Sequence, residues 1–276
     1  MTHVLISADM EGITGVTCPA DVEPGTDGWR GFRQLMASDV NAAVEGFFAA
    51  GASAVTVNDA HATKRNIPIE ALDERATLIT GTHKRLGMME GIADGVDAVA
   101  FVGYHTGAGR QGVLSHTYIG TTILDVRING QQAGEGRMNA LLAAEHGVPV
   151  VLVTGDDLTC EDASRWAPDA ERVAVKTCVD RYTARCLPPA RTRELIAGAA
   201  RRALARRRPP PRPEGPFTYE VEFDSVQAVV ATTAIPSVTQ TGERSVSFTL
   251  ETMDEAIRCF RAVSALALAS TEPAYG

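Results

Sequence analysis

The sequence predicts an α/β fold with a mostly parallel central sheet, flanking helices and a smaller C-terminal α+β part. Short apolar runs bounded by turn residues alternate with helical stretches through the first 207 residues. The helical stretches are rich in alanine and the apolar runs in valine and isoleucine, which favour helices and strands respectively. The pattern then changes to three strand-like segments and one helix. We therefore expect two parts, a catalytic α/β domain at 1–207 and an α+β subdomain at 208–276.

In the first half of the chain, strand-like and helical segments follow one another. A helix is expected near residues 31–50, where Phe32, Leu35, Met36 and Val40 recur at helical spacing. The other expected elements are strands at 4–8, 54–59, 76–80 and 98–105 and a short helix around 84–92. Because helices that alternate with strands act as crossover connections, this order favours parallel pairing with helices on both faces of the sheet.

The second half continues the alternation as far as a proline-rich break. Residues 113–129 are expected to form two strands around Gly120, and Thr159 is expected to cap the helix that follows a buried strand at 148–157. The remaining elements expected are helices at 135–146, 190–207 and 254–270, strands at 171–176, 217–223, 225–233 and 245–251, and the break itself at 208–216.

Charge and cysteine content limit the classes of partner. The net charge of −8 and a pI near 5.3 disfavour binding to nucleic acid or to an anionic membrane. Residues 201–213 are basic, but the run ends in prolines, so we interpret it as a helix C-terminus and a linker. No apolar run approaches the roughly 20 residues of a membrane helix, and the first residues lack the features of a signal peptide. Five scattered cysteines without a CxxC pair indicate reduced thiols and a cytoplasmic location.

Acids and histidines fall where the predicted strands end. Asp9 and Glu11 follow the first strand and are separated by one residue, so in an extended chain both carboxylates project to one face, roughly 6 to 7 Å apart. His61 follows the second strand, and His105 closes the fourth. Because ligands bind at the carboxyl ends of parallel strands, these side chains form a candidate metal site. A mixed carboxylate and imidazole set without cysteine favours catalytic zinc, although Mn or Co suits the same ligands.

Each of these residues also has an ordinary structural interpretation. A carboxylate beside a loop commonly caps a turn, and a histidine at a strand end commonly bonds to a backbone carbonyl. Asp59, next to His61, either shapes the turn or orients the imidazole of His61. Glu135 is a favourable acid in the first turn of a helix. His3, His83 and His146 are interpreted as structural or surface residues.

A set of motifs resembles the D-aminopeptidase family of zinc metallopeptidases, whose founding members belong to bacterial dipeptide-transport operons. The motifs are SADMEGITG at 7–15, VNDAH at 57–61, GYH at 103–105, VLSHT at 113–117, AGEGRMNA at 133–140 and VTGDD at 153–157. Residues 174–189 and the closing helix are also similar to the family, so the resemblance spans nearly the whole chain.

The resemblance implies a centre with two zinc ions per chain. Asp9 would bridge both ions, Glu11 and His61 would complete one site, and His105 with Glu135 would complete the other. His116 matches the family position described as the catalytic residue or nucleophile. On chemical grounds we favour attack by a metal-activated hydroxide, with His116 moving a proton or stabilising the oxyanion.

The activity implied by the family is release of an N-terminal D-amino acid, such as D-Ala, from short peptides. Family members form ring-shaped homodecamers, so we expect a homo-oligomer in which the ring restricts access to small substrates, and residues 18–31 are a candidate lid. One alternative is a related amidase that acts on a specialised small-molecule amide. A two-metal phosphoesterase is disfavoured because no Gly-rich phosphate cradle or arginine cluster accompanies the ligands. A non-catalytic binding protein is disfavoured by the complete ligand set.

Overall fold

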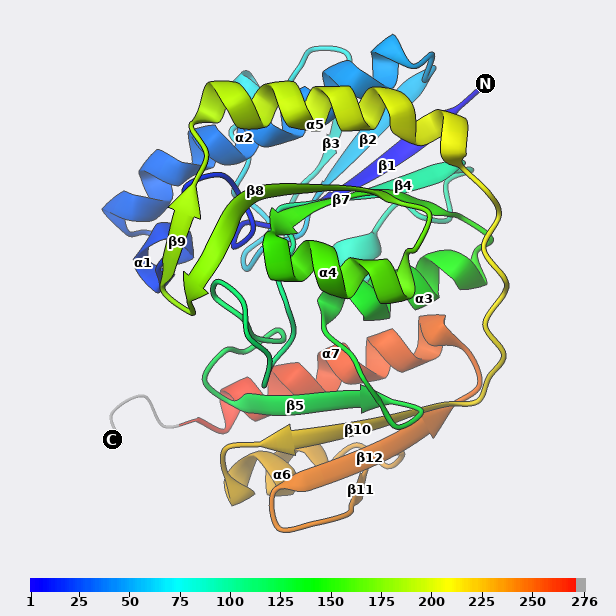
Figure 1. Cartoon of the computed structure of the whole chain (residues 1–276). Coiled ribbons are helices and arrows are strands. Elements are labelled where there is room, and N and C mark those ends of the chain that lie inside the picture. The colour runs from blue at the N-terminus through cyan, green and yellow to red at the C-terminus, as the bar shows by residue number, and fades with distance from the viewer. Residues whose placement is uncertain (272–276) are drawn as a thin grey trace.

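The computed structural model describes residues 1–271, which form two sheets with their associated helices (Figure 1). The first sheet has the strand order β3-β2-β1-β4-β7-β8-β9. Its strands are β1 (His3–Ala8), β2 (Ala54–Asp59), β3 (Thr77–Ile79), β4 (Ala98–Val102), β7 (Val150–Asp156), β8 (Glu171–Asp180) and β9 (Thr183–Cys186). All neighbouring strands pair in parallel except β8 and β9, which are antiparallel. The predicted α/β class with a mostly parallel sheet is therefore confirmed.

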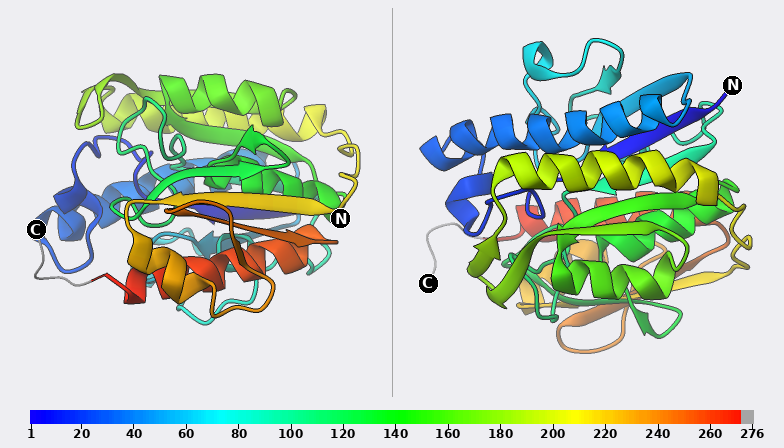
Figure 2. Two further views of the ribbon diagram at one scale, coloured as in Figure 1. Left: turned by 90° about the horizontal axis from the view of Figure 1, so that it is seen from below. Right: turned by 45° about the horizontal axis from the view of Figure 1, so that its top comes forward.

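Helices cover both faces of this sheet. The helices α2 (Asp27–Ala49) and α5 (Pro189–Ala203) run side by side over one face (Figure 2). The opposite face packs against α3 (Glu135–Glu145), α4 (Asp157–Trp166) and the 3-10 helix η2 (Gly87–Met89). Side chains of β1 alternate between the two sides: Val4 and Ile6 belong to the core under α2 and α5, whereas Leu5 belongs to the other core. The period of two follows from the pleat of a strand.

The second sheet is antiparallel and has the strand order β11-β12-β10-β5-β6. Its strands are β5 (Ile123–Ile128), β6 (Gln131–Gln132), β10 (Phe217–Phe223), β11 (Thr239–Gln240) and β12 (Ser245–Leu250), and its helices are α6 (Val226–Thr232) and α7 (Met253–Ala269). The sheet thus combines strands from 1–207 and from 208–276. The division into two domains stays a prediction, and residues 272–276 lie outside the described part of the chain.

The remaining short elements connect the larger ones. They are α1 (Pro19–Val22) and the 3-10 helices η1 (Ile69–Ala71) and η3 (Leu204–Arg206). Residues 207–216 contain neither helix nor strand, as expected for the linker after the basic helix end. The basic residues before this linker pair with β8, since Arg202 of α5 and Arg206 of η3 bind Glu171 at 2.7 and 2.8 Å. Within residues 1–271, no helix combines the length and the apolar character needed to cross a membrane.

Several expected elements are wrong. Residues 113–129 contain one strand, β5, and the segment before it is an irregular loop in which Leu114 and Tyr118 adopt left-handed φ values of 52° and 56°. Residues 225–233 form helix α6 instead of a strand. Its valines favour a strand locally, but packing of Ala228 and Val229 into the core beside α7 decides the outcome.

Two helix predictions also need correction. The segment 84–92 contains only the 3-10 helix η2 rather than an α-helix. The cap of α4 is Asp156 and not Thr159: an Asp156 carboxylate oxygen accepts the backbone amide of Thr159 at 2.7 Å and its hydroxyl at 2.6 Å. An aspartate at the N-cap satisfies amides that the first helical turn leaves unpaired, and its charge suits the helix dipole.

Candidate metal centre

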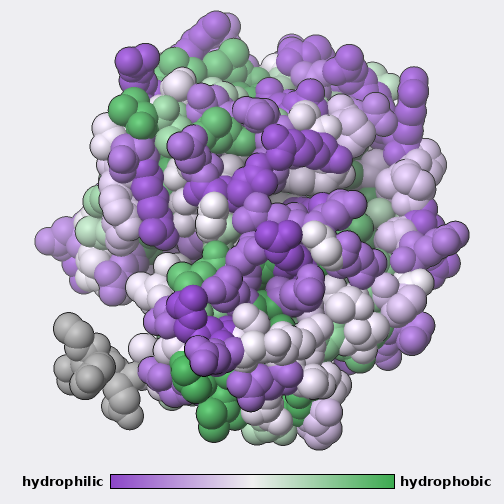
Figure 3. Space-filling view, turned by 60° about the horizontal axis from the view of Figure 1, so that its bottom comes forward, coloured by the Kyte–Doolittle hydropathy of each residue, from purple (hydrophilic) through white to green (hydrophobic). Residues whose placement is uncertain are grey.

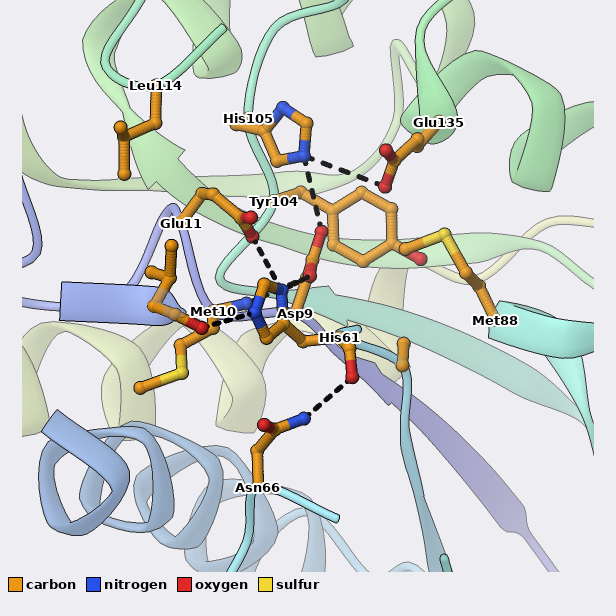
Figure 4. A network of polar contacts seen from close by, with 12 residues as sticks. Asp9, Met10, Glu11, His61, Asn66, Met88, Tyr104, His105, Leu114 and Glu135 are labelled. Atoms are coloured by element: carbon orange, nitrogen blue, oxygen red, sulfur yellow. Dashed lines mark hydrogen bonds and ion pairs between the residues drawn. The ribbon is translucent and has the colours of Figure 1, made fainter. Parts of the chain in front are cut away.

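Acidic and histidine side chains converge where the central strands of the first sheet end (Figure 4). Asp9 directly follows β1, and Glu11 lies on the loop after it. His61 and His105 follow β2 and β4, the two strands that flank β1. Glu135 is the first residue of α3. All of these residues are buried, with exposed fractions of 2% to 8%. Parallel strands end at one edge, so residues far apart in the sequence meet there.

The five side chains form two groups that share Asp9. In the first group, Nδ1 of His61 lies 3.3 Å from a carboxylate oxygen of Asp9 and 3.1 Å from one of Glu11. In the second group, Nε2 of His105 lies 3.4 Å from the other Asp9 oxygen and 3.6 Å from Glu135. The candidate ligand atoms of each group lie within 4.8 Å of one another. Because each oxygen of Asp9 faces a different histidine, this carboxylate can bridge two cations.

Three polar atoms that face the centre lack hydrogen-bond partners. Oδ2 of Asp9, Oε2 of Glu11 and Nε2 of His105 are buried without a hydrogen bond in residues 1–271. Buried polar atoms normally have partners, so three such atoms in one place require an explanation. Carboxylate oxygen and imidazole nitrogen are good zinc ligands. The donor set therefore fits a metal centre.

The far nitrogens of the two histidines are held by backbone carbonyls. Nε2 of His61 lies 2.9 Å from the oxygen of Val22, and Nδ1 of His105 lies 2.9 Å from the oxygen of Thr106. A carbonyl only accepts, so in the neutral imidazole these nitrogens carry the hydrogen. The opposite nitrogens, which face the carboxylates, then present lone pairs. Such bonds fix the tautomer and ring orientation that metal ligation requires.

Charges within the cluster stabilise one another. Burial raises the pKa of the Asp9 carboxyl, but the neighbouring imidazoles of His105 and His61 outweigh burial and hold this pKa well below its usual value. Burial lowers the pKa of both histidines, yet the surrounding carboxylates hold both pKa values well above that of free imidazole. A bound metal cation would replace the protons, because a ligating imidazole is neutral.

His116 lies at the more accessible side of the centre. Its ring stacks on that of His105, with centroids 4.3 Å apart and planes inclined by 7°. Its Nε2 lies 3.7 Å from a Glu11 oxygen, and its Nδ1 donates to the carbonyl of Leu114 at 2.8 Å. The side chain is 17% exposed, compared with 2% for His105. This imidazole can therefore exchange a proton with a molecule that enters from outside. His116 also forms a third possible ligand group with Glu11 and His105, in which the candidate ligand atoms lie within 4.8 Å of one another.

The loop that carries Glu11 is held by a buried lysine that the sequence did not identify. Lys176 of β8 is 1% exposed. Its ammonium donates to the carbonyls of Glu11, Ile13 and Val16 at 2.6, 3.0 and 2.6 Å. Burying an ammonium is costly unless all its donors are used, and here all three are used. The sequence signal is a lysine inside an otherwise apolar strand.

The same loop is also fixed against α2 and β4. The buried carboxylate of Asp39 accepts the backbone amide and the hydroxyl of Thr14 at about the same distance, 2.9 Å. Gly12 donates its amide to Gly103 at 2.8 Å, and a Cβ on Gly12 would lie 2.0 Å from the carbonyl oxygen of Tyr104. Glycine is therefore required at position 12, because any side chain would push the loop away from the end of β4.

A second buried lysine holds the end of β2. Lys84 donates to the side chain of Asn58 at 2.6 Å and to the carbonyls of Asp59 and Ile79 at 2.6 and 2.9 Å. The carboxylate of Asp59 accepts backbone amides from residues 66–67. Of the two roles considered for Asp59, the geometry favours the shaping of the turn that follows His61.

The candidate lid lies directly against the centre. Residues 18–31 form α1 and the first turn of α2, and Val22 at the end of α1 supplies the carbonyl that bonds to His61. Movement of this segment would therefore release one orienting contact of His61.

A large cavity lies elsewhere. It has a volume of about 660 Å³ and is bounded by α3, α4 and residues 206–213. Arginines line much of it, namely Arg110, Arg137, Arg165, Arg206, Arg207, Arg208 and Arg212. Asp9, Glu11, His61, His105 and Glu135 do not line it. The arginine-rich surface is thus separate from the candidate ligands.

Comparisons with known proteins agree on one family. The family model described as D-aminopeptidase matches residues 2–262. A D-aminopeptidase of Bacillus subtilis (strain 168) is 32% identical over 270 residues, which cover 95% of this chain and 97% of the relative. A solved structure, the Zn-dependent D-aminopeptidase DppA from Bacillus subtilis, described as a self-compartmentalizing protease, matches with a TM-score of 0.93 and 29% identity over the full length of both chains.

Proposed function

Since this chain belongs to the D-aminopeptidase family, we propose that it is a zinc-dependent metallo-aminopeptidase that removes an N-terminal D-amino acid from short peptides. The observation that carries the proposal is the pair of ligand groups that share Asp9. Family membership alone does not establish that a site is intact, because function resides in particular residues rather than in the fold. In this chain every expected ligand is present and buried. Four of them follow central strands, and Glu135 is the first residue of α3.

The proposed centre holds two zinc ions per chain. Asp9 would bridge them, with Glu11 and His61 on one ion and His105 and Glu135 on the other. This arrangement is supported by the division of the two Asp9 oxygens between the two histidines. It is also supported by the backbone bonds at the far nitrogen of each imidazole. When bound, zinc supplies Lewis-acid activation of water and of the scissile carbonyl.

Proton transfer is then assigned to a residue of the chain, His116. Nδ1 of His116 donates to the carbonyl of Leu114, which leaves Nε2 as the basic nitrogen at the accessible side. We assign to this nitrogen the transfer of a proton from the attacking water to the departing amine. The stacked ring of His105 keeps the imidazole plane in place.

We further propose a homo-oligomer, specifically a homodecameric ring that admits small peptides. The support is the solved relative that is described as self-compartmentalizing. This chain also exposes apolar side chains suited to subunit contacts, notably Val226 and Val230 of α6 at 52% and 69% and Val179 of β8 at 58%. The face in Figure 3 is largely hydrophilic, and its hydrophobic side chains gather in separate patches. A cytoplasmic location stays a prediction, in keeping with five cysteines that form no disulfide in residues 1–271.

The alternatives remain distinguishable by chemistry. An amidase that acts on a specialised small-molecule amide would use the same centre with a different pocket. A phosphoesterase is not favoured, because the arginines that could bind phosphate line a cavity away from the ligands.

The decisive experiment measures metal and activity on one sample. Elemental analysis gives bound zinc per chain, and D-alanine release is measured from D-Ala-D-Ala and D-Ala-Gly-Gly against their L counterparts. We expect about two zinc ions per chain, as in two-metal aminopeptidase sites, and D-selective release. Zinc without peptide turnover, or turnover of a chromogenic phosphate ester instead, would contradict the proposed substrate. A folded protein that binds no zinc would contradict the centre itself.

A further inference from the structure

Three lysines lie near the proposed metal centre, and their ammonium groups differ in the number of hydrogen-bond acceptors that they contact. Lys176 and Lys84 each donate to three acceptors. Lys64 donates to one, the carbonyl of Ala60, and it takes part in no ion pair within residues 1–271. Since an ammonium has three donors, the first two lysines are fully used by the fold, whereas Lys64 has donors to spare.

Lys64 is held at the edge of the centre by its backbone. It follows His61 in a turn in which Ala62 and Lys64 adopt left-handed φ values of 40° and 59°. Such conformations cost free energy in residues other than glycine and persist only where other contacts enforce them. Here the amide of Lys64 donates to the carbonyl of His61 at 2.7 Å, and its carbonyl accepts the amide of Gly81 at 2.7 Å.

The contact with Ala60 places the ammonium beside the metal ligands. The amide of Ala60 donates to the carbonyl of Ala8 at 2.7 Å, so Ala60 lies against the peptide that leads into Asp9. Burial lowers the pKa of Lys64, while the carboxylates of Asp9 and Glu135 act in the opposite direction. The ammonium of Lys64 therefore lies next to the segment that leads into Asp9, whose carboxylate both ligand groups share.

Charge balance leaves Lys64 without a partner in the loaded enzyme. The carboxylates of Asp9, Glu11 and Glu135 carry three negative charges, which two divalent zinc ions would more than neutralise. The nearby carboxylate of Asp59 is occupied by backbone amides of residues 66–67. A cation with unused donors and no anionic partner among residues 1–271 is suited to an anion on the substrate.

We propose that Lys64 binds the free C-terminal carboxylate of a dipeptide substrate and so makes the enzyme prefer dipeptides to their neutral amides. This inference rests on the proposed aminopeptidase function. The carboxylate of a dipeptide lies one residue beyond the scissile bond, and Lys64 follows the candidate ligand His61 by three residues at the edge of the centre. Lys64 is thus a specificity-determining residue, and zinc binding does not depend on it.

The test compares D-Ala-D-Ala with D-Ala-D-alaninamide, which differ only in the terminal charge. Wild-type protein is expected to favour the free acid in kcat/KM on the order of 10- to 100-fold, the usual contribution of one charge-assisted hydrogen bond. Lys64→Met is expected to remove this preference by raising KM for the free acid while leaving the amide nearly unchanged. Lys64→Arg retains a cation and is expected to restore part of the preference.

Arg65→Met is the matched control, because it removes a neighbouring exposed cation and changes the net charge equally. It is expected to keep the preference for the free acid. Zinc content and the thermal midpoint of Lys64→Met should equal those of wild type. Loss of zinc in this variant, with both substrates slowed equally, would overturn the inference in favour of a metal-supporting role.

The remaining outcomes separate the two proposals. If wild-type protein hydrolyses both compounds equally well, or if Lys64→Met keeps the preference for the free acid, the role of Lys64 is wrong and the aminopeptidase function stands. If wild-type protein with bound zinc hydrolyses neither compound, the proposed function is wrong, and the role of Lys64 is overturned with it.

Discussion

The ammonium nitrogen of Lys176 lies 2.6 Å from the backbone oxygen of Glu11, which connects β8 to the loop that supplies a carboxylate to the proposed metal centre. The two residues are 165 positions apart in the sequence. The same ammonium also holds the carbonyls of Ile13 and Val16. One buried cation therefore sets the path of the backbone on which Glu11 depends.

Replacement of this cation should weaken one half of the centre more than the other. Lys176→Met keeps the length of the side chain but leaves three carbonyl oxygens without their donor, which is expected to lower the free energy of unfolding by about 2 to 4 kcal/mol. Zinc titration of the folded variant should show weaker binding of the ion assigned to Glu11 and His61, because Glu11 moves while His105 and Glu135 stay fixed. Two zinc ions bound with wild-type affinity would contradict this role for Lys176.

The ligand groups predict how zinc is lost from single variants. Asp9→Asn should reduce the affinity for both ions, since one carboxylate belongs to both groups. Glu11→Gln and Glu135→Gln should each lower the affinity for one zinc ion, on the order of 10- to 100-fold or more, while the other ion stays bound. The zinc retained per chain by each variant is measured by elemental analysis after dialysis against a weak chelator. Equal loss from all three variants would argue against two separate sites.

His116 should be separable from the ligands by its effect on activity. His116→Gln removes the proton acceptor, so kcat for D-Ala-D-Ala is expected to fall on the order of 100- to 10,000-fold. Zinc content should remain at the wild-type value, because His116 is assigned to proton transfer rather than to ligation. Loss of zinc would instead place His116 in the third possible ligand group, with Glu11 and His105.

The positions of the candidate ligands could be predicted because they depend on local sequence. Asp9, His61 and His105 each follow an apolar run, and parallel strands that alternate with helices end at one edge. Knowledge of which segments are strands is therefore enough to bring these side chains together. A ligand role for Glu135 was harder to predict from the residues, because the helix dipole alone is enough to explain an acid at a helix N-terminus.

The features that could not be predicted depend on contacts between segments that are distant in the sequence. The left-handed conformations of Leu114 and Tyr118, which shape the loop around His116, occur at residues whose type does not favour them. Helix α6 carries valines that favour a strand, and its packing against α7 overrides that preference. The role of Lys176 depends on partners more than 150 positions away, so its sequence neighbours do not indicate it.

Asp39 should give stability a characteristic dependence on pH. Burial raises the pKa of this carboxyl from 3.8 to about 6, although hydrogen bonds from Thr14 oppose the change. A folded-state pKa above the unfolded value means that the folded protein binds more protons between these two values. Stability should therefore fall as pH rises from about 4 to about 6, by at most about 3 kcal/mol from this group, and stay lower above that range.

Asp39→Asn tests this dependence because an asparagine cannot ionise. Relative to wild type, the variant should gain stability as pH rises from 4 to 7, so its free energy of unfolding should increase relative to that of wild type, measured by urea unfolding of the zinc-loaded protein at each pH. Asp73→Asn is the control of opposite sign, since the hydrogen bond from Arg75 lowers the pKa of Asp73 and its stabilisation is lost as pH falls. If the curves of Asp39→Asn and wild type run parallel across this range, Asp39 ionises in the folded protein as it does in the unfolded chain, and its burial beneath the Glu11 loop carries no electrostatic penalty.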